Sequence, residues 1–295
     1  MKRKPTQKKE GTLVVIGGHE DKESDCVILH EIAKRVGSGD LVIATVATRE
    51  PDEYFGSYDK IFKRLGIKNV TKLHLRDRRE RMGEKKRAIL KKASGIFFTG
   101  GDQLRISSQI GDTLFEKYVK DIYDRGGIIA GTSAGASAMG ETMLLKGSNS
   151  ESHKIGDLHL APGLGLIPNV IIDQHFAERG RIGRLLGSIA INPRMLGIGI
   201  DEDTAIVRHD GHFSVIGSGA VYIVDGCGVT HSNIAEAEPE SILSIFNVML
   251  HILSTGDNFS LIDRKPIIPA QAASHDKEQA RLKEKVAGTG TPLLS

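Results

Sequence analysis

The stretch that decides the fold is Gly126-Gly-Ile-Ile-Ala-Gly-Thr-Ser133-Ala-Gly-Ala-Ser-Ala138, in which an apolar run meets a tight turn and then small, helix-compatible residues. This pattern predicts a buried strand, a sharp turn and a helix, with the hydroxyl of Ser133 at the apex. Glycines on both sides of the serine permit a strained backbone that larger residues would resist. The G-x-S-x-G string alone is a weak signal, because a serine that caps an ordinary strand–helix turn would fit the same pattern more simply.

Short apolar runs alternate with helical patterns through the first half of the chain. The expected strands span 11–18, 41–47, 69–75 and 95–103, and the expected helices span 26–36, 54–65, 84–93 and 114–125. The mixed charge run at 76–81 indicates a solvated loop or a helix start. This alternation predicts an α/β fold in which a mostly parallel sheet is flanked by helices on both faces.

The second half of the chain is less regular. Strands are expected at 169–175 and 195–200, a helix from the Arg- and Gly-rich segment 179–184 to 191, and a polar loop at 148–158. Short alternating segments at 205–208, 213–217 and 220–224 predict a small antiparallel extension of the sheet. Residues 242–253 are expected to form a helix.

The chain has 295 residues, which is long enough to bury a large core, and its composition is that of a globular protein. We expect one catalytic α/β domain over 11–269, between a basic tail at 1–10 and a second tail at 270–295, both disordered. A net charge of +3 is too small to indicate nucleic-acid binding. No signal peptide or membrane span is expected, and Cys26 and Cys227 lack metal or redox spacing. These features predict a cytoplasmic protein with reduced thiols.

Polar groups follow four of the expected strands. They are Gly100-Gly-Asp-Gln103, Ser133, Asp173-Gln-His175 and Asp201-Glu-Asp203, while His19-Glu-Asp21 follows the first strand without an assigned role. Because parallel strands end at one edge of a sheet, these groups can meet there. A serine nucleophile needs an imidazole base, and the base needs a carboxylate to orient it. Ser133, His175 and one acid from 201–203 supply this set, and spacing alone does not choose the acid.

Each of these residues taken singly could have a purely structural role. His175 could be a core histidine, and the acids at 201–203 could form a solvated turn. His209 and His212 have H-x-x-H spacing, but no third ligand is evident, so no metal site is expected. The order Ser, His, acid along the chain also departs from the order of the α/β-hydrolases.

Four motifs together resemble the cyanophycinase family of serine peptidases, relatives of aspartyl dipeptidase (peptidase E). The motifs are Gly100-Gly-Asp-Gln103, Gly131-Thr-Ser-Ala-Gly-Ala136, Asp173-Gln-His-Phe-Ala-Glu-Arg-Gly-Arg-Ile-Gly-Arg184 and Gly199-Ile-Asp-Glu-Asp-Thr-Ala205. The resemblance runs from about residue 11 to 269. It implies a flavodoxin-like fold similar to that of class I glutamine amidotransferases, a homodimer, and no cofactor.

The resemblance also implies a reaction and its residues. Ser133 would be the nucleophile, His175 the base and Glu202 the orienting acid, with the backbone N–H groups of Gly101 and Ala134 as the oxyanion hole. The substrate-binding positions would be Gln103, Asp173, Gln174, Arg179, Arg181 and Arg184. The substrate would be cyanophycin, an arginyl-polyaspartate polymer that is cleaved to β-Asp-Arg dipeptides.

Two alternatives remain open at this point. The chain could be an α-aspartyl or isoaspartyl dipeptidase on the same scaffold, or a non-catalytic binder of a charged polymer. The arginine segment favours the polymer hydrolase, because guanidinium groups bind carboxylates in a planar, bidentate fashion. A glutamine amidotransferase is disfavoured because that chemistry uses cysteine at the elbow, where this chain has Ser133.

Overall fold

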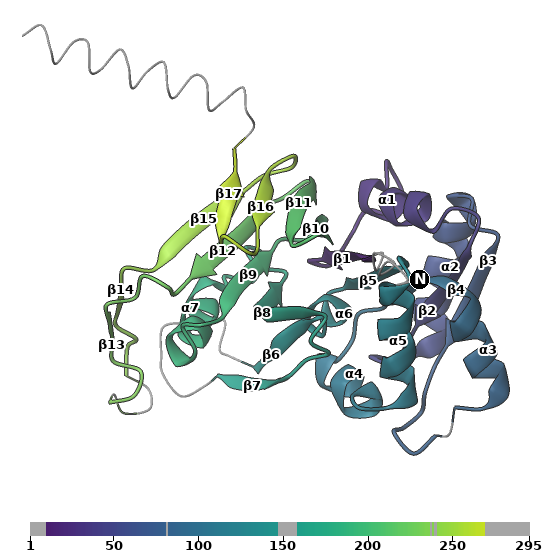
Figure 1. The fold of residues 1–295 in the computed structure, drawn as a ribbon, viewed down its shortest axis with the longest axis horizontal. Coiled ribbons are helices and arrows are strands. Elements are labelled where there is room, and N and C mark those ends of the chain that lie inside the picture. The colour runs from purple at the N-terminus through teal and green to yellow at the C-terminus, as the bar shows by residue number, and fades with distance from the viewer. Residues whose placement is uncertain (1–9, 81, 147–157, 237, 239–240, 269–295) are drawn as a thin grey trace, which may run out of the picture.

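A computed structural model describes residues 10–80, 82–146, 158–236, 238 and 241–268. Two large β-sheets lie side by side, with most helices gathered around the first sheet and one helix on the second (Figure 1). The expected tails and the expected loop at 148–158 lie outside the described residues, except for Glu10 and Leu158. Glu10, the last residue of the expected N-terminal tail, accepts a hydrogen bond from Tyr123 Oη at 2.6 Å.

The first sheet has nine strands in the order β17-β16-β11-β10-β1-β5-β4-β2-β3. Its parallel half consists of β1 (Thr12–Ile16), β2 (Asp40–Ala44), β3 (Asn69–Leu73), β4 (Ala93–Phe98) and β5 (Ile128–Thr132). Its antiparallel half consists of β10 (Thr204–His209), β11 (His212–Gly217), β16 (Asn258–Ser260) and β17 (Lys265–Ile267). The parallel order places β1 beyond β5, whereas flavodoxin has the order 2-1-3-4-5.

Helices cover both faces of the parallel half, as the alternation of patterns predicted. They are α1 (Val27–Val36), α2 (Pro51–Arg64), α3 (Glu84–Lys92), α4 (Gln103–Ile110), α5 (Leu114–Asp124) and the short α6 (Ala134–Ser137). Successive residues of β1 point to opposite faces: Val14 packs in the core that holds α1 and α2, and Val15 in the core that holds α3 and α5. The helix α4 was not predicted. None of the helices in the described ranges is long and apolar enough to cross a bilayer.

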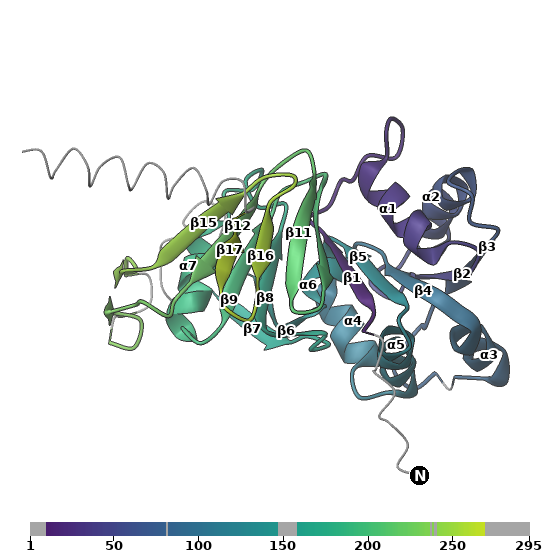
Figure 2. The same cartoon turned by 45° about the horizontal axis from the view of Figure 1, so that its top comes forward.

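The second sheet has six strands in the order β15-β12-β9-β8-β6-β7. These strands are β6 (Gly140–Lys146), β7 (His159–Pro162), β8 (Ile167–Gln174), β9 (Leu196–Ile200), β12 (Val221–Asp225) and β15 (Met249–Leu253). Strands β6, β8 and β9 run parallel, and α7 (Ile182–Ile191) packs on one face of the sheet. The other face shares a hydrophobic core with the first sheet, because Ile172 and Ile198 pack in the same cluster as Val15 and Val215. Figure 2 shows the two sheets from a second direction.

The structure corrects three expectations. The strand ends that carry polar groups belong to two sheets rather than to one, because β8 and β9 pair with each other and not with β5. The segment expected at 220–224 lies mostly in β12 (Val221–Asp225) of the second sheet instead of extending the β10–β11 hairpin. Residues 242–253 form the short β14 (Ile245–Phe246) and β15 instead of a helix; β14 pairs with β13 (His231–Ser232), and β15 pairs with β12. Short apolar runs are ambiguous between helix and strand, and pairing with β12 decides here.

Candidate active site

Ser133 lies where β5 ends and α6 begins, as its sequence predicted. Its backbone has φ +52°, a value that non-glycine residues rarely adopt and that is found where a side chain is held for function. The turn is possible because glycine precedes it: a Cβ on Gly131 would lie 2.7 Å from the carbonyl oxygen of Gly135. The N–H of Ser133 donates to Ile16 O at 3.0 Å, which fastens the turn to β1.

His175 follows β8 and brings its ring to Ser133 from the second sheet. Its Nε2 lies 2.9 Å from Ser133 Oγ, and the ring is buried. Its backbone N–H donates to Gly17 O at 2.9 Å in the loop after β1. That loop passes directly against the imidazole, because a side chain on Gly18, which has φ +111°, would overlap the ring of His175.

Glu202 follows β9 and completes a chain of contacts. Its Oε1 lies 2.6 Å from His175 Nδ1. Its two neighbours have other partners: Asp201 accepts from the N–H groups of Ala177 and Ala220, and Asp203 accepts from the N–H of Asp21. The three acids that the sequence could not separate are therefore distinguished by geometry, with Glu202 on the imidazole.

The surroundings shift both titrating groups of this pair. Burial lowers the pKa of His175 below its ordinary value, and the charge of Arg179 lowers it further, while the hydrogen bond to Glu202 opposes them. Burial alone would raise the pKa of Glu202, but hydrogen bonds from His175 and His19 outweigh burial and lower it. At neutral pH His175 is therefore a neutral imidazole beside a carboxylate, an arrangement that could accept a proton from a serine hydroxyl.

The turn between β4 and α4 lies next to Ser133. A side chain added at Gly100 would begin 3.6 Å from the Cβ of Ser133. Asp102 N donates to Ala47 O at 3.0 Å, which fixes this turn to the loop after β2. The turn that carries Gly101 is therefore close to the nucleophile, and Ala134 follows Ser133 as the first residue of α6.

The two glutamines have different contacts. Gln174 Oε1 is 3.4 Å from Ser133 Oγ, so this side chain lies at the candidate site. Gln103, at the start of α4, donates from Nε2 to Leu144 O at 3.0 Å and so links the helix to β6.

The arginine segment divides into two environments. Arg179 is exposed, and its N–H donates to His175 O at 3.2 Å. Arg181 and Arg184 are buried and both pair with Asp173, which is also buried: Arg181 Nη1 lies 3.1 Å and Arg184 Nε 2.6 Å from its oxygens. Burial lowers the pKa of Arg181 to about 10, although Asp173 opposes the shift. The anionic partner of these two arginines is therefore a residue of the chain.

Sequence reasoning gave no role to the residues after β1. Glu20 is buried beneath the elbow, where its Oε2 accepts from Thr132 Oγ1 at 2.6 Å and its Oε1 accepts from Tyr58 Oη. His19 contacts Glu202 through Nδ1 and Oε2 at 2.8 Å. The sequence did place His19 and Glu20 directly after a buried strand, at the sheet edge where ligands bind, and that position could have marked them as candidates.

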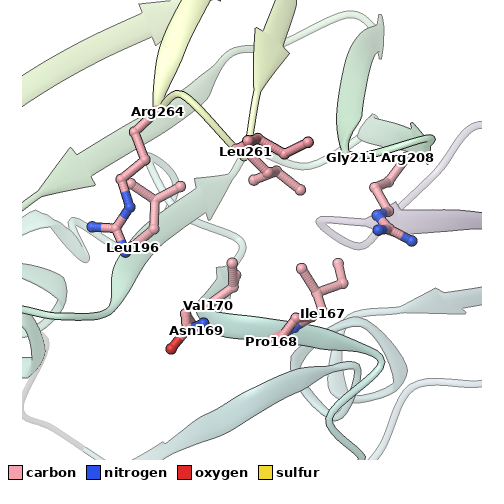
Figure 3. Close-up of a pocket in the computed structure, with 10 residues that line it drawn as sticks. Ile167, Pro168, Asn169, Val170, Leu196, Arg208, Gly211, Leu261 and Arg264 are labelled. Carbon is pink, nitrogen blue, oxygen red and sulfur yellow. The ribbon is translucent and has the colours of Figure 1, made fainter.

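A separate pocket of about 310 Å³ lies at the opposite end of β8 and β9 (Figure 3). Its aliphatic wall includes Val170 and Leu196 near the starts of these strands, whereas His175 and Glu202 follow their ends. Arg208 and Arg264 flank the pocket, but Arg208 pairs with Glu10 and Arg264 pairs with Asp225 at 2.9 Å. These guanidinium groups have structural partners, so we assign the pocket no part in the site.

Comparison with known proteins places the chain in a family. The family model described as peptidase family S51 matches residues 13–216, which include Ser133, His175 and Glu202. The chain belongs to peptidase family S51. It is 42% identical over 263 residues to the cyanophycinase of Trichormus variabilis, which covers 88% of each chain. It is 40% identical over 268 residues to the cyanophycinase of Synechococcus elongatus, which covers 88% of this chain and 83% of that one.

A solved structure supports the fold independently. The peptidase from an acI-B1 actinobacterium aligns with a TM-score of 0.61 and 22% identity, and the alignment covers 85% of this chain and 97% of that peptidase. At this identity the similarity concerns the arrangement of strands and helices. The two-sheet architecture is thus that of a known peptidase fold rather than a new combination.

Proposed function

We propose that this S51 peptidase is a cyanophycinase, a serine exopeptidase that hydrolyses cyanophycin to β-Asp-Arg dipeptides. The observation that carries the proposal is the continuous contact from Ser133 through His175 to Glu202. The curated relatives at 40–42% identity, both named cyanophycinase, supply the substrate class.

The geometry supports an acyl-transfer mechanism. Ser133 Oγ attacks the scissile carbonyl while its proton passes to His175 Nε2, and Glu202 stabilises the imidazolium that forms. The backbone N–H groups of Gly101 and Ala134 are proposed to hold the oxyanion. His175 then gives the proton to the leaving amine, and an acyl group remains on Ser133. Water then attacks the ester while its proton passes to His175, and His175 returns that proton to Ser133 Oγ as the acyl fragment leaves.

Substrate contacts follow from exposure. Arg179 is the arginine of the segment that is exposed beside His175, and we assign it to a carboxylate of the polymer. Gln174 and Gln103 are assigned to the bound peptide near Ser133. Asp173, Arg181 and Arg184 are assigned a positioning role, because they are buried on one another and Arg181 also donates to the carbonyl of Gln174.

The reaction is tested directly on the polymer. The purified chain should release β-Asp-Arg from insoluble cyanophycin, detected by mass, and a serine-directed inhibitor should abolish the release. A chain that instead cleaves α-Asp or isoaspartyl dipeptides and leaves the polymer intact would be the dipeptidase alternative. A chain that retains cyanophycin without releasing any product would be a binder.

Replacing Glu202 by glutamine should lower kcat for β-Asp-Arg release by about 10²–10⁴-fold. The amide keeps the size of the side chain but removes the negative charge that stabilises protonated His175. Steady-state kinetics would measure the effect. The matched control is Asp203→Asn, one residue along the same turn and bonded to Asp21 N instead of the imidazole. An equal loss in both variants would count against a specific role for Glu202.

We also propose a homodimer through the neighbouring edges of the two sheets. The edge strands β15 and β17 flank a groove of about 450 Å³ and expose apolar side chains, among them Leu250, Ile252 and Ile267. β17 carries Lys265 and Pro266, so the exposed apolar surface comes mainly from β15 and from Ile267. An exposed apolar patch of this kind is suited to burial against a second copy of itself.

Ile252→Lys should convert this dimer to monomer, because the side chain is 61% exposed at the proposed interface and a charge there would lose its hydration on association. Light scattering after size-exclusion chromatography gives the mass. Val27→Lys is the matched control, since Val27 is also apolar and exposed but lies on α1. A native monomer, or a dimer that Ile252→Lys leaves intact, would contradict the proposal.

Three further expectations remain proposals. They are the kinship with class I glutamine amidotransferases, the single catalytic domain over 11–269 and the cytoplasmic location. The two sheets share one hydrophobic core, which supports a single domain, because each separate domain has a hydrophobic core of its own. Cys26 and Cys227 are both free thiols, which is compatible with a reducing compartment.

A further inference from the structure

A second imidazole lies beside the one that contacts Ser133. The two oxygens of Glu202 are divided between them, with Oε2 2.8 Å from His19 Nδ1 and Oε1 2.6 Å from His175 Nδ1. The two rings meet edge to face with centroids 5.1 Å apart. The acyl-transfer mechanism uses His175 and Glu202 but gives no task to His19.

The backbone holds His19 in this position. Its φ of +47° is a left-handed conformation that costs energy for a residue with a side chain. The loop is fixed on both sides, because Asp203 N donates to Gly18 O at 2.8 Å and Asp21 N donates to Asp203 Oδ1 at 2.8 Å. The loop after β1 and the turn after β9 are thus one connected structure that carries His19 and Glu202.

We propose that His19, His175 and Glu202 form a zinc-binding site through which Zn²⁺ inhibits the peptidase, an inference that rests on the proposed function. Among the described residues these three each offer one ligand atom, and the atoms lie within 4.8 Å of one another. Ligands about 2.0–2.1 Å from a tetrahedral zinc ion lie about 3.3 Å apart, so small side-chain movements would complete the site. Two imidazoles and a carboxylate favour zinc over Mg²⁺ or Ca²⁺, which prefer oxygen ligands.

The site is open to solvent on the side of His19. The side chain of His19 is 72% exposed and that of Glu202 26%, whereas His175 is buried. A metal ion can therefore be captured first by His19 and Glu202 and then by His175. The fourth zinc position would be filled by water, as in other three-ligand sites.

Binding would remove the general base. Zinc on Nδ1 of His175 leaves the ring proton on Nε2, which can then donate to Ser133 Oγ but cannot accept its proton. Zinc on Nε2 would occupy the accepting lone pair itself. In both cases Ser133 would not be activated.

The test measures zinc binding apart from turnover. The Ser133→Ala chain, freed of metal with a chelator and dialysed, keeps all three ligands, and titration calorimetry with ZnCl₂ should show one site per chain. His19→Gln in the same background should weaken zinc affinity at least about 100-fold, because losing even an outer partner of a zinc ligand costs about 10–100-fold. His209→Gln, a histidine at the far end of β10, should leave the affinity unchanged.

Inhibition is measured in the chain with Ser133 intact. ZnCl₂ should abolish β-Asp-Arg release, a chelator should restore it, and equal MgCl₂ should have no effect. The His19→Gln chain, compared with its own zinc-free rate, should need at least about 100-fold more zinc for the same inhibition. Zinc binding that survives His19→Gln, or that is lost in His209→Gln instead, would overturn the proposal. Because calorimetry needs no substrate, failure of the zinc site is distinguishable from failure of the proposed reaction.

Discussion

Replacing Ser133 by alanine should lower kcat for release of β-Asp-Arg by about four to six orders of magnitude, the range seen when the nucleophile of a serine triad is removed. The substitution removes the oxygen that lies 2.9 Å from His175 Nε2, and hence the atom that we propose forms the acyl-enzyme. The proposed oxyanion donors and substrate contacts would remain, so binding of the polymer should survive. Product release followed by mass, together with a pull-down on insoluble cyanophycin, separates the two properties.

The matched control for this variant is Ser137→Ala. Ser137 is a buried serine at the end of α6, four residues after the nucleophile, and its N–H donates to Ser133 O. Alanine keeps that backbone hydrogen bond, so activity should fall by less than about tenfold. A Ser133→Ala chain that keeps more than about 1% of the native rate would rule out the serine mechanism, since binding and oxyanion stabilisation alone do not supply that rate.

The sequence predicted the parallel half of the first sheet because short strand-like segments there alternate with segments of helical period. It did not predict that β8 and β9 form a second sheet. Their apolar runs resemble those of β1 and β5, and strand pairing depends on long-range packing rather than on local pattern. The helix predicted over residues 242–253 was wrong for a related reason: the spacing of apolar residues in a short run does not distinguish a strand from a helix.

The sequence also indicated which side chains would meet. The strand ends pointed to Ser133 and His175, and resemblance to a family pointed to Glu202 where spacing left three acids open. The structure brings these three side chains into contact, and their roles in the reaction remain a proposal. The environments of the arginines were not predicted, although Arg181 and Arg184 are three residues apart and so face one side of a helix start, whereas Arg179 precedes it. A shared carboxylate partner for the pair could have been inferred from that spacing. The position of His19 could not, since it depends on contact between two loops distant in sequence.

Asp173→Asn should reduce the free energy of unfolding by about 3–5 kcal/mol, the typical cost of removing one partner of a buried ion pair. Asp173 is 1% exposed and is the shared partner of Arg181 and Arg184, which are themselves buried. Asparagine keeps the shape of the side chain and one accepting oxygen, but it leaves two guanidinium charges without a counter-charge. Urea unfolding followed by circular dichroism would measure the loss. Asp52→Asn, which removes an exposed charge paired with Lys72, should lower the free energy of unfolding far less.

A second substitution distinguishes charge imbalance from general damage. Arg184→Met in the Asp173→Asn chain removes one of the two unpaired charges and fills similar volume, so the double variant should be more stable than Asp173→Asn alone. A double variant that is less stable by the sum of both single losses would show that the residues act independently. Because Arg181 also donates to the carbonyl of Gln174, directly before His175, recovery of stability should be accompanied by partial recovery of β-Asp-Arg release. The ion pair between Asp173 and Arg181 would then position His175, and Arg179 would remain the arginine available to substrate.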